Sequence, residues 1–416
     1  MRKDERPVNG MGPLEGHGQR PLRIGIVTDG LKEAGEGDAV RIGNGGVGVY
    51  IAELVAALLR VDTVNEYTLL RCGGGRLPLY REPRLRTAIV PWNAARRFTR
   101  WLDLPYARLA TRLGLDVVHH PNQFGGLALP RSVRQVASLH DLSPLQHPEW
   151  HQTPTVLRYR LLLRRALARA DAVLVEADRA RDELLQAGLV EPGRVAVVPL
   201  GVSPRFSPVA RRAVPRPDLP ATYVLSVGVL EPRKNLPALF EAVRRLHERG
   251  RRAGLVIAGR PGWRWKDPRT DPRFAGLLPH TVVLRDVPDD ELPALYAGAA
   301  VVAIPSWSEG FGLPVLEALA CGVPVVASTA VPAADLVPDL VLRAEPDAPG
   351  ALSDALQRAL DDDALRRRVA ERAPQIVRDW SWDRTALATL EAYRRSAAGV
   401  RAFVPAESRQ PALVQP

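Results

Sequence analysis

The sequence predicts an α/β protein in which two Rossmann-like, doubly wound parallel-sheet domains face a cleft. Three observations support this fold class. The chain has 416 residues, enough for two domains that each bury a full core. In both halves, short and wholly apolar runs alternate with longer helical patterns, which is typical of parallel strands joined by helices. A run rich in proline and arginine, residues 203–220, separates the two series of runs.

The first domain is predicted to span residues 21–205. It begins with a buried strand at Leu22–Thr28, and a glycine-rich loop then leads into a helix over Val49–Arg60. Five more strands are expected at Tyr67–Arg71, Asp116–His119, Gln135–Leu139, Ala172–Glu176 and Ala196–Val198. Since the ligands of such sheets gather at the carboxyl ends of the strands, a binding site is expected there.

The second domain is predicted to span residues 206–385. Its first strand is expected at Tyr223–Gly228, and a helix follows that ends at Arg249. The later strands are expected at Leu255–Ala258, Val282–Leu284, Val301–Ile304 and Pro324–Ala327, with helices at residues 289–299 and 314–321 between them. Residues 1–20 are predicted to be a disordered leader without the apolar core of a signal peptide, and residues 403–416 a disordered tail.

Composition narrows the possible partners and the compartment. The formal net charge is +11, which indicates an anionic partner such as phosphate groups or acidic lipid. Nucleic acid is not expected, because no recognised nucleic-acid-binding module is present. Cys72 and Cys321 lie far apart and match no metal or redox spacing, which is typical of a reducing cytosol. No apolar run reaches the ~18–20 residues that span a bilayer. A cytoplasmic protein is therefore expected.

The segment from Ser306 to Ser328 is the most informative part of the sequence. It predicts a strand, a polar glycine-containing loop, a short helix and a second strand. Backbone N–H groups at the start of the helix attract anions. Two carboxylates, Glu309 and Glu317, flank that point and suit hydroxyl groups, which donate to carboxylates. An anion site with hydroxyl-binding groups on both sides describes a sugar nucleotide; the predicted donor-binding residues of this loop are Gly310, Phe311, Gly312 and Leu313.

The string EGFGLPVLEA, which begins at Glu309, resembles the E-x7-E signature of retaining GT-B glycosyltransferases, most of all family four. The two-Glu spacing by itself also fits a helix cap beside a solvated helix face. The resemblance covers roughly residues 22–398. It implies a GT-B fold whose last helix crosses back to the first domain. This helix is expected at Trp382–Arg395, and the C-terminal segment that crosses back is given the bounds 386–402. It further implies transfer of a hexose-type sugar, with retention, from a UDP, GDP or dTDP sugar to an acceptor hydroxyl of a glycan, a lipid-linked compound or a small molecule.

Two adjacent cations, Arg233 and Lys234, lie in the predicted turn between the first strand and the first helix of the second domain. Cations oppose the dipole at a helix N-terminus, so local stability does not explain them. They can neutralise a diphosphate leaving group, which removes the need for a metal. The segment EPRKN also resembles the phosphate-binding segment of the family. We therefore expect both residues to be catalytic and expect neither a metal nor a cofactor.

In the first domain, a glycine-rich loop and a histidine are the candidate site elements. A loop containing Gly45 and Gly46 can bring N–H groups against a phosphate, although a turn without a ligand fits this short pattern too. The resemblance assigns both glycines to the donor phosphate. His140 ends a predicted strand, where it can contact a sugar or bond to backbone; the resemblance implies the sugar contact and a catalytic role. His119 is expected to be structural.

Three further sets of residues are assigned from the sequence. Gly259, Arg260 and Val287 lie in turns that are expected to surround the base and ribose of the donor. Three aspartates, residues 361–363, could suggest a metal, but their place at a helix start favours a capping run. After the strand that ends near Val175, the family commonly has Ser, whereas this chain has Glu176-Ala177-Asp178; acidic residues near the cleft suit a hydroxylated or cationic acceptor.

Two basic clusters in the first domain allow two interpretations. One is a helix whose arginines face water; the other is peripheral contact with anionic membrane, near a lipid-linked acceptor. The first cluster has Arg96, Arg97, Arg100, Trp101, Arg108 and Arg112, and the second has Arg158, Arg160, Arg164, Arg165 and Arg169 beside Leu157, Leu161 and Leu162.

Two alternatives to the glycosyltransferase remain at this stage. One is a sugar-nucleotide epimerase of the same fold, which needs no acceptor surface. The other is a non-catalytic scaffold that binds nucleotide. Glu309, Glu317, Lys234 and His140 are all present, which disfavours the scaffold. In the preferred interpretation Glu309 holds sugar hydroxyls and Glu317 holds the ribose.

Overall fold

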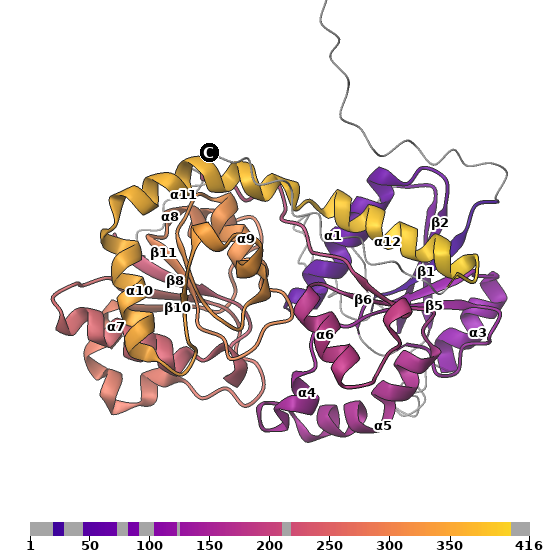
Figure 1. Ribbon diagram of the computed structural model, residues 1–416, viewed down its shortest axis with the longest axis horizontal. Coiled ribbons are helices and arrows are strands. Elements are labelled where there is room, and N and C mark those ends of the chain that lie inside the picture. Colours follow the sequence, from indigo (N-terminus) through magenta and orange to yellow (C-terminus); the bar gives the residue numbers. More distant parts are fainter. Residues whose placement is uncertain are drawn as a thin grey trace, which may run out of the picture.

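The computed structural model describes residues 20–28, 45–72, 82–90, 104–122, 125–209 and 218–400, and it confirms two parallel-sheet domains (Figure 1). The first sheet has seven strands in the order β3-β2-β1-β4-β5-β6-β7, and all its pairs are parallel. Its strands are β1 Arg23–Val27, β2 Glu66–Cys72, β3 Leu85–Val90, β4 Val117–His120, β5 Arg134–Ser138, β6 Ala172–Val175 and β7 Val195–Val197.

The second sheet has six parallel strands in the order β10-β9-β8-β11-β12-β13. The order of both sheets reverses next to the first strand, as in doubly wound folds, and such a switch point is where ligands bind. The strands are β8 Tyr223–Val227, β9 Gly254–Ala258, β10 Thr281–Leu284, β11 Val301–Ile304, β12 Val325–Ser328 and β13 Val341–Ala344.

Strand β11 shows why these runs are wholly apolar. Successive side chains of a strand point to opposite faces of its sheet. Val301 and Ala303 belong to the core with α7 and α10, whereas Val302 and Ile304 belong to the core with α8 and α9. Helices therefore cover both faces; they are α7 Leu236–Glu248, α8 Leu292–Gly298, α9 Leu313–Ala320 and α10 Pro349–Asp361.

Two edge strands, β3 and β13, were missed by the sequence interpretation. An edge strand is less enclosed, so its sequence need not be a continuous apolar run. In β3 the side chain of Ile89 is half exposed, and in β13 the two middle residues are only partly buried. The helices of the first domain are α1 Gly46–Val61, α3 Leu104–Leu113, α4 Ser143–Gln146, α5 Thr153–Arg169 and α6 Asp178–Gln186.

The last helix, α12 (Trp382–Ala397), follows α11 (Asp363–Ile376) and lies along the first domain against α1 (Figure 1). Arg60 of α1 forms an ion pair with Asp383 at 2.6 Å. Gly201 allows the close approach, because a Cβ atom there would lie 2.1 Å from the backbone nitrogen of Trp382. The helix therefore joins the two domains into one packed unit.

Helix α5 has a buried side and an exposed side of mixed character. Its core side includes Tyr159 and Leu163, whereas Leu157 and Leu161 are 48% and 55% exposed. Both leucines therefore share the outer face with arginines. Of the other basic cluster, Arg96, Arg97, Arg100 and Trp101 lie outside the described residues. In the part of the chain that the structure covers, no helix is long and apolar enough to cross a membrane.

Candidate active site

A cavity of about 440 Å³ lies between the domains, at the ends of β5 and β6 on one side and after β11 on the other. Of the residues assigned from sequence, His140, Glu309 and Gly310 line it. The complete lining is Leu139, His140, Asp141, Leu142, Gln146, His147, Arg179, Ala180, Glu183, Trp307, Ser308, Glu309, Gly310, Ala330 and Pro332.

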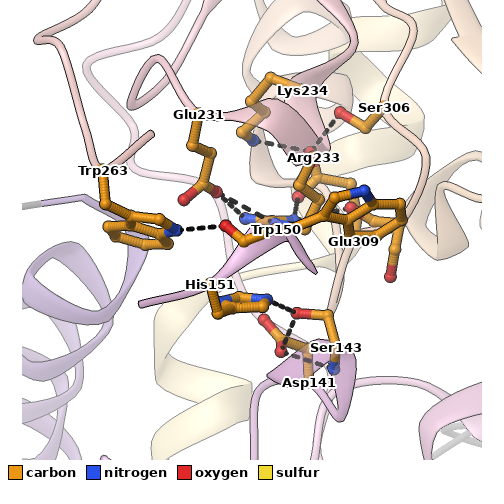
Figure 2. A network of polar contacts seen from close by, with 11 residues as sticks. Asp141, Ser143, Trp150, His151, Glu231, Arg233, Lys234, Trp263, Ser306 and Glu309 are labelled. Atoms are coloured by element: carbon orange, nitrogen blue, oxygen red, sulfur yellow. Dashed lines mark hydrogen bonds and ion pairs between the residues drawn. The ribbon is translucent and has the colours of Figure 1, made fainter. Parts of the chain in front are cut away.

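The two predicted cations and the first predicted carboxylate form one buried cluster (Figure 2). Arg233 Nη1 donates to Glu309 Oε2, and Lys234 Nζ donates to Glu309 Oε1, each at 2.7 Å. Ser306 Oγ donates to the same carboxylate at 2.6 Å. Burial raises the pKa of Glu309, but Lys234, Arg233 and the Ser306 hydroxyl outweigh it, and the pKa falls to about 2. Glu309 is therefore ionised at any physiological pH.

A second carboxylate, Glu231, holds Arg233 from the other side. Its Oε1 accepts from Arg233 Nη2 at 2.7 Å, and the carbonyl of Ser308 accepts from Arg233 Nη1 at the same distance. Burial raises the pKa of Glu231, although Arg233 and Lys234 oppose this. Two cations and two carboxylates thus share one desolvated cluster, and the guanidinium is fixed before any ligand arrives.

Backbone conformation fixes the turn that carries both cations. The turn is a short 3-10 helix, Pro232–Lys234, that ends at Asn235 with a left-handed φ of 51°. The Asn235 side chain donates to the carbonyls of Pro305 and Pro346, which attaches the turn to the segment after β11. Asparagine tolerates this conformation better than most residues, which explains its presence here.

The glycines assigned to the donor lie at the N-termini of two helices. Gly312 precedes α9 with a φ of 101°, so the N–H groups of Phe311, Gly312 and Leu313 occur at the helix start, as the sequence predicts. Gly45 precedes α1 with a φ of 77°, and Gly46 is the first residue of that helix. A Cβ atom on Gly45 would lie 3.1 Å from the side chain of Val229, so the N-terminus of α1 abuts the second domain.

The second predicted carboxylate, Glu317, is in a different environment. It lies inside α9 with only 8% of its surface exposed, and its Oε2 accepts from the Tyr296 hydroxyl at 2.6 Å. Burial raises its pKa, and neither Tyr296 nor the nearby Arg205 fully opposes this. Glu317 lies on a narrow crevice that also includes Glu53 of α1, and so it is separate from the main cavity.

His140 lines the cavity, but both of its ring nitrogens already have partners. Nε2 donates to the carbonyl of Pro121 at 2.6 Å, and Nδ1 donates to Glu176. Burial lowers the pKa of His140, but Glu176 and the Pro121 carbonyl outweigh it, and the net shift is upward. The ring is therefore held in place with both nitrogens facing acceptors, which favours its protonated form. Glu176, one of the acidic residues that the sequence interpretation placed near an acceptor, is the partner of this histidine.

Gly310 brings the two domains into contact beside His140. A Cβ atom on Gly310 would lie 1.8 Å from the carbonyl oxygen of His140 and 3.3 Å from Glu176. Any side chain at this position would push the loop after β11 away from the first domain. The glycine is thus required by a close backbone approach across the cavity.

The other two histidines of the strand ends are structural. His119 is completely buried, and its ring nitrogens bond to Tyr393 and Ser138 at 2.7 and 2.8 Å, as the structural assignment predicts. Burial lowers its pKa to about 3. His120 Nε2 accepts from the Gly126 N–H at 3.1 Å, and burial lowers its pKa to about 3 as well.

The residues assigned to the base and ribose lie at the ends of β9 and β10, away from the lining of the main cavity. Gly259 packs on the backbone of Gly228, since a Cβ atom would lie 1.8 Å from its carbonyl oxygen. Arg260 forms an ion pair at 2.8 Å with Asp286, the residue that precedes Val287. The structure therefore places Gly259, Arg260 and Val287 on one side of the second domain but not with His140.

Two polar features of the site were missed by the sequence interpretation (Figure 2). Trp263 Nε1, from the second domain, donates to the carbonyl of Trp150 in the first at 2.8 Å. Ser143 Oγ donates to Asp141 Oδ1 at 2.7 Å and bonds to His151 Nε2 at 2.8 Å. The D-x-S pattern at Asp141 is a typical turn sequence and could have indicated the second feature.

Of the three aspartates at residues 361–363, the middle one caps a helix, as expected. Asp362 precedes α11 and accepts from the Leu365 N–H at 2.8 Å. Among the described residues, no three histidine, cysteine, aspartate or glutamate side chains come together as metal ligands would.

Comparisons with known proteins agree with the fold. The family glycosyl transferases group 1 matches residues 210–376, and glycosyltransferase family 4 matches residues 44–206. O-antigen chain mannosyltransferase B of Escherichia coli is 32% identical over 67% of this chain and 74% of its own. D-inositol 3-phosphate glycosyltransferase of Kineococcus radiotolerans is 30% identical over 91% of this chain and 95% of its own.

Among solved structures, Anabaena HepE in complex with UDP-glucose has a TM-score of 0.67 at 17% identity, covering 90% of this chain and 99% of that one. At this identity the likeness concerns the fold, which is GT-B. The two family matches cover both domains, and the group 1 match includes the Glu309–Glu317 segment and the cationic turn. The chain therefore belongs to the group 1 glycosyltransferases of family 4.

Proposed function

We propose that this glycosyltransferase takes a hexose-type sugar from a nucleoside-diphosphate sugar and transfers it, with retention, to an acceptor hydroxyl without a metal. The observation that carries the proposal is the buried cluster of Arg233, Lys234 and Glu309, next to the start of α9. UDP sugars are the first donors to test, because a structural neighbour was solved with UDP-glucose.

In this mechanism, the cationic turn stabilises the leaving group. The bond between the anomeric carbon and the diphosphate oxygen breaks, and the diphosphate leaves with the electron pair. Arg233 and Lys234 compensate its growing charge together with the N–H groups at the starts of α9 and α1, which include those of Phe311 and Gly46. Because both cations are already desolvated and held, little reorganisation is needed in the transition state.

Retention is proposed to follow from attack on the same face that the leaving group departs from. The acceptor oxygen forms its bond to the anomeric carbon, and its proton passes to an oxygen of the leaving phosphate. Glu309 cannot easily be a covalent nucleophile, because Arg233, Lys234 and Ser306 already bind its oxygens. We assign Glu309 to the sugar hydroxyls and to the cations, and Glu317 to the ribose.

His140 is proposed to act through its charge as well as its position. Its imidazolium lies in the wall of the cavity beside Gly310, with Glu176 behind it. A sugar hydroxyl could gain a bond from it only by replacing the Pro121 carbonyl. The positive edge of the ring can still orient a hydroxyl oxygen of the donor sugar.

A screen of nucleotide sugars tests this function. Purified protein is incubated with UDP, GDP and dTDP sugars, with and without glycoside acceptors, and mass spectrometry follows the products. We expect slow hydrolysis of one donor and a product heavier than an acceptor by one hexose residue. Isomerisation of a donor without any transfer would instead identify the epimerase, and binding without turnover would identify the scaffold.

We also propose that the outer face of α5 makes a peripheral contact with anionic membrane on the cytoplasmic side. Leu157 and Leu161 are about half exposed on that face, next to Arg160, Arg164 and Arg165. Apolar side chains surrounded by cations suit an interface with acidic headgroups. Co-sedimentation with vesicles that contain phosphatidylglycerol should be lost in Leu157→Ser/Leu161→Ser; equal sedimentation with neutral vesicles would exclude the charge-dependent contact.

A further inference from the structure

The cavity has polar groups that the proposed donor chemistry does not use. They come from the first domain and lie opposite the loop that holds Glu309 and Gly310. Asp141 follows His140 directly, while Gln146 and Glu183 come from α4 and α6. Gln146 Nε2 donates to Glu183 Oε2 at 3.2 Å, so these two side chains form one pair.

Asp141 is held in one orientation by a buried chain. Its Oδ1 accepts from the backbone N–H and the hydroxyl of Ser143 at 3.1 and 2.7 Å. Ser143 is completely buried and bonds to His151 Nε2 at 2.8 Å, and burial lowers the pKa of His151. Within the described part of the chain, Oδ2 of Asp141 has no protein donor. The carboxylate is therefore oriented in advance and keeps one oxygen for a ligand.

The charges on this side of the cavity are unfavourable for an anion. Asp141 and Glu183 are both carboxylates. Among the described residues, Arg179 is the one guanidinium in the lining, and it donates to the Thr329 carbonyl at 3.1 Å. The positive charge of His140 is matched by Glu176, and Arg233 and Lys234 are not part of this lining. A phosphate here would face two carboxylates, which repel it.

An aromatic surface completes the cavity. The Trp307 side chain belongs to the lining and is 37% exposed, so much of its ring is available to a ligand. A pyranose ring has one face of C–H bonds, which packs on an aromatic ring, and an edge of hydroxyl groups, which donate to carboxylates. Trp307 and Asp141 line the cavity from different domains, and together they suit such a ring.

We infer that this cavity is the acceptor site, that it takes a neutral sugar such as the terminal residue of a glycan or glycoside, and that Asp141 binds one of its hydroxyls. The inference rests on the proposed function, since Glu309 and Gly310 place the donor sugar at the same cavity. Asp141 and Glu183 also exclude phosphorylated acceptors. This sets the chain apart from relatives whose name specifies inositol 3-phosphate.

The test is the ratio of two specificity constants measured on one enzyme preparation. With the donor identified by the screen, kcat/KM is determined for a neutral methyl hexoside and for the matching hexose phosphate. The wild type should prefer the neutral acceptor. In Asp141→Asn the ratio should fall about 10- to 100-fold, because a charge-assisted hydrogen bond and a repulsive charge are both lost. Glu183→Gln should also lower the ratio.

A ratio remains valid even if a variant is partly unfolded, because both acceptors are assayed with the same active fraction. Asp354→Asn serves as the control, since Asp354 lies on α10 with 67% of its side chain exposed and should leave the ratio unchanged. A wild type that prefers the phosphorylated acceptor, or a ratio that neither cavity variant changes, would overturn the inference alone. Failure to cleave any nucleotide sugar would overturn the proposed function itself.

Discussion

Glu309 and Glu317 come from one short segment, but they occupy opposite electrostatic environments. Glu309 lies in the loop before α9, where Lys234 and Arg233 contact it and its pKa is about 2. Glu317 lies within α9, where burial raises its pKa and the Tyr296 hydroxyl is its hydrogen-bonding partner. The spacing of two carboxylates thus indicates where a donor could bind, whereas their neighbours decide what each can do.

The difference follows from the number of cations in contact with each carboxylate. Both side chains are buried, which by itself disfavours the charged form. Two cations reverse this at Glu309, but a neutral phenol and a more distant arginine do not reverse it at Glu317. Glu309 therefore belongs to the cluster with Arg233 and Lys234, which we propose binds the diphosphate, and Glu317 is proposed to serve a neutral group such as ribose.

The largest effect is expected for Lys234, one of the two cations that contact Glu309. Lys234→Ala should lower kcat/KM, with a loss of ~2–4 kcal/mol of transition-state stabilisation, because an electrostatic stabiliser of the leaving group is removed. Steady-state kinetics with the identified donor measure this change. Lys266→Ala is the matched control, since Lys266 is exposed and outside the cluster. A similar loss in both variants would show that the effect is not local.

The pH dependence of stability should separate the two carboxylates. The pKa of Glu309 falls from 4.5 to about 2 on folding, so its ionisation adds about 3 kcal/mol above pH 4.5 that is lost as the pH falls toward 2. For Glu317 the pKa rises on folding, so stability is lost as the pH rises from 4.5 through the raised value.

Urea unfolding of the wild type, Glu309→Gln and Glu317→Gln, from about pH 3 to about pH 7, measures both trends. The stability of the wild type relative to Glu309→Gln should increase with pH. Its stability relative to Glu317→Gln should decrease. Parallel curves for the two variants would contradict the opposite environments described above.

Catalysis should distinguish the same two side chains. Glu309→Gln should lower kcat about 10- to 100-fold, because the sugar hydroxyl it holds positions the anomeric carbon. Nucleoside diphosphate should still bind near normally, since Arg233 and Lys234 remain and lose a competing carboxylate. Product inhibition constants measure this. A variant that loses product binding but keeps kcat would reverse the assignment.

A smaller and different change is expected at the second carboxylate. Glu317→Gln should raise the donor KM about tenfold and weaken nucleoside diphosphate to a similar degree, with kcat little changed. The ribose is remote from bond breaking, so its contacts act alike on ground and transition states. Donor saturation curves check this split, and a pure kcat effect would place Glu317 next to the reacting carbon instead.

Chelation should have the smallest effect of all. Excess EDTA should leave the turnover of the wild type largely intact, because Arg233 and Lys234 supply the positive charge at the diphosphate. Turnover before and after dialysis against EDTA provides the measurement. Complete inhibition that added Mg²⁺ or Mn²⁺ restores would mean that the cationic turn is not sufficient.

Much of the fold was predictable from sequence, because central parallel strands are buried on both faces and leave continuous apolar runs such as Val301–Ile304. The two missed strands, β3 and β13, lie at sheet edges, where this pattern fades. The cationic turn and the two carboxylates were predictable because each depends on a few adjacent residues. Their pairing was not, since Arg233 and Glu309 are 76 positions apart.

The same limit applies to the first domain. His140 was identified from its place at a strand end, but its partner Glu176 is 36 positions away, so its charged state could not be predicted. The chain of Asp141, Ser143 and His151 is local in sequence, yet its role depends on the cavity that both domains enclose.

The central claim is that Arg233 and Lys234 bind the diphosphate of the donor, and calorimetric titration tests it most directly. The wild type and Lys234→Ala are titrated with a nucleoside and with its diphosphate. We expect the variant to bind the diphosphate about tenfold or more weakly, while its affinity for the nucleoside barely changes. An equal loss of affinity for both ligands would contradict the claim and remove Lys234 from the phosphate site.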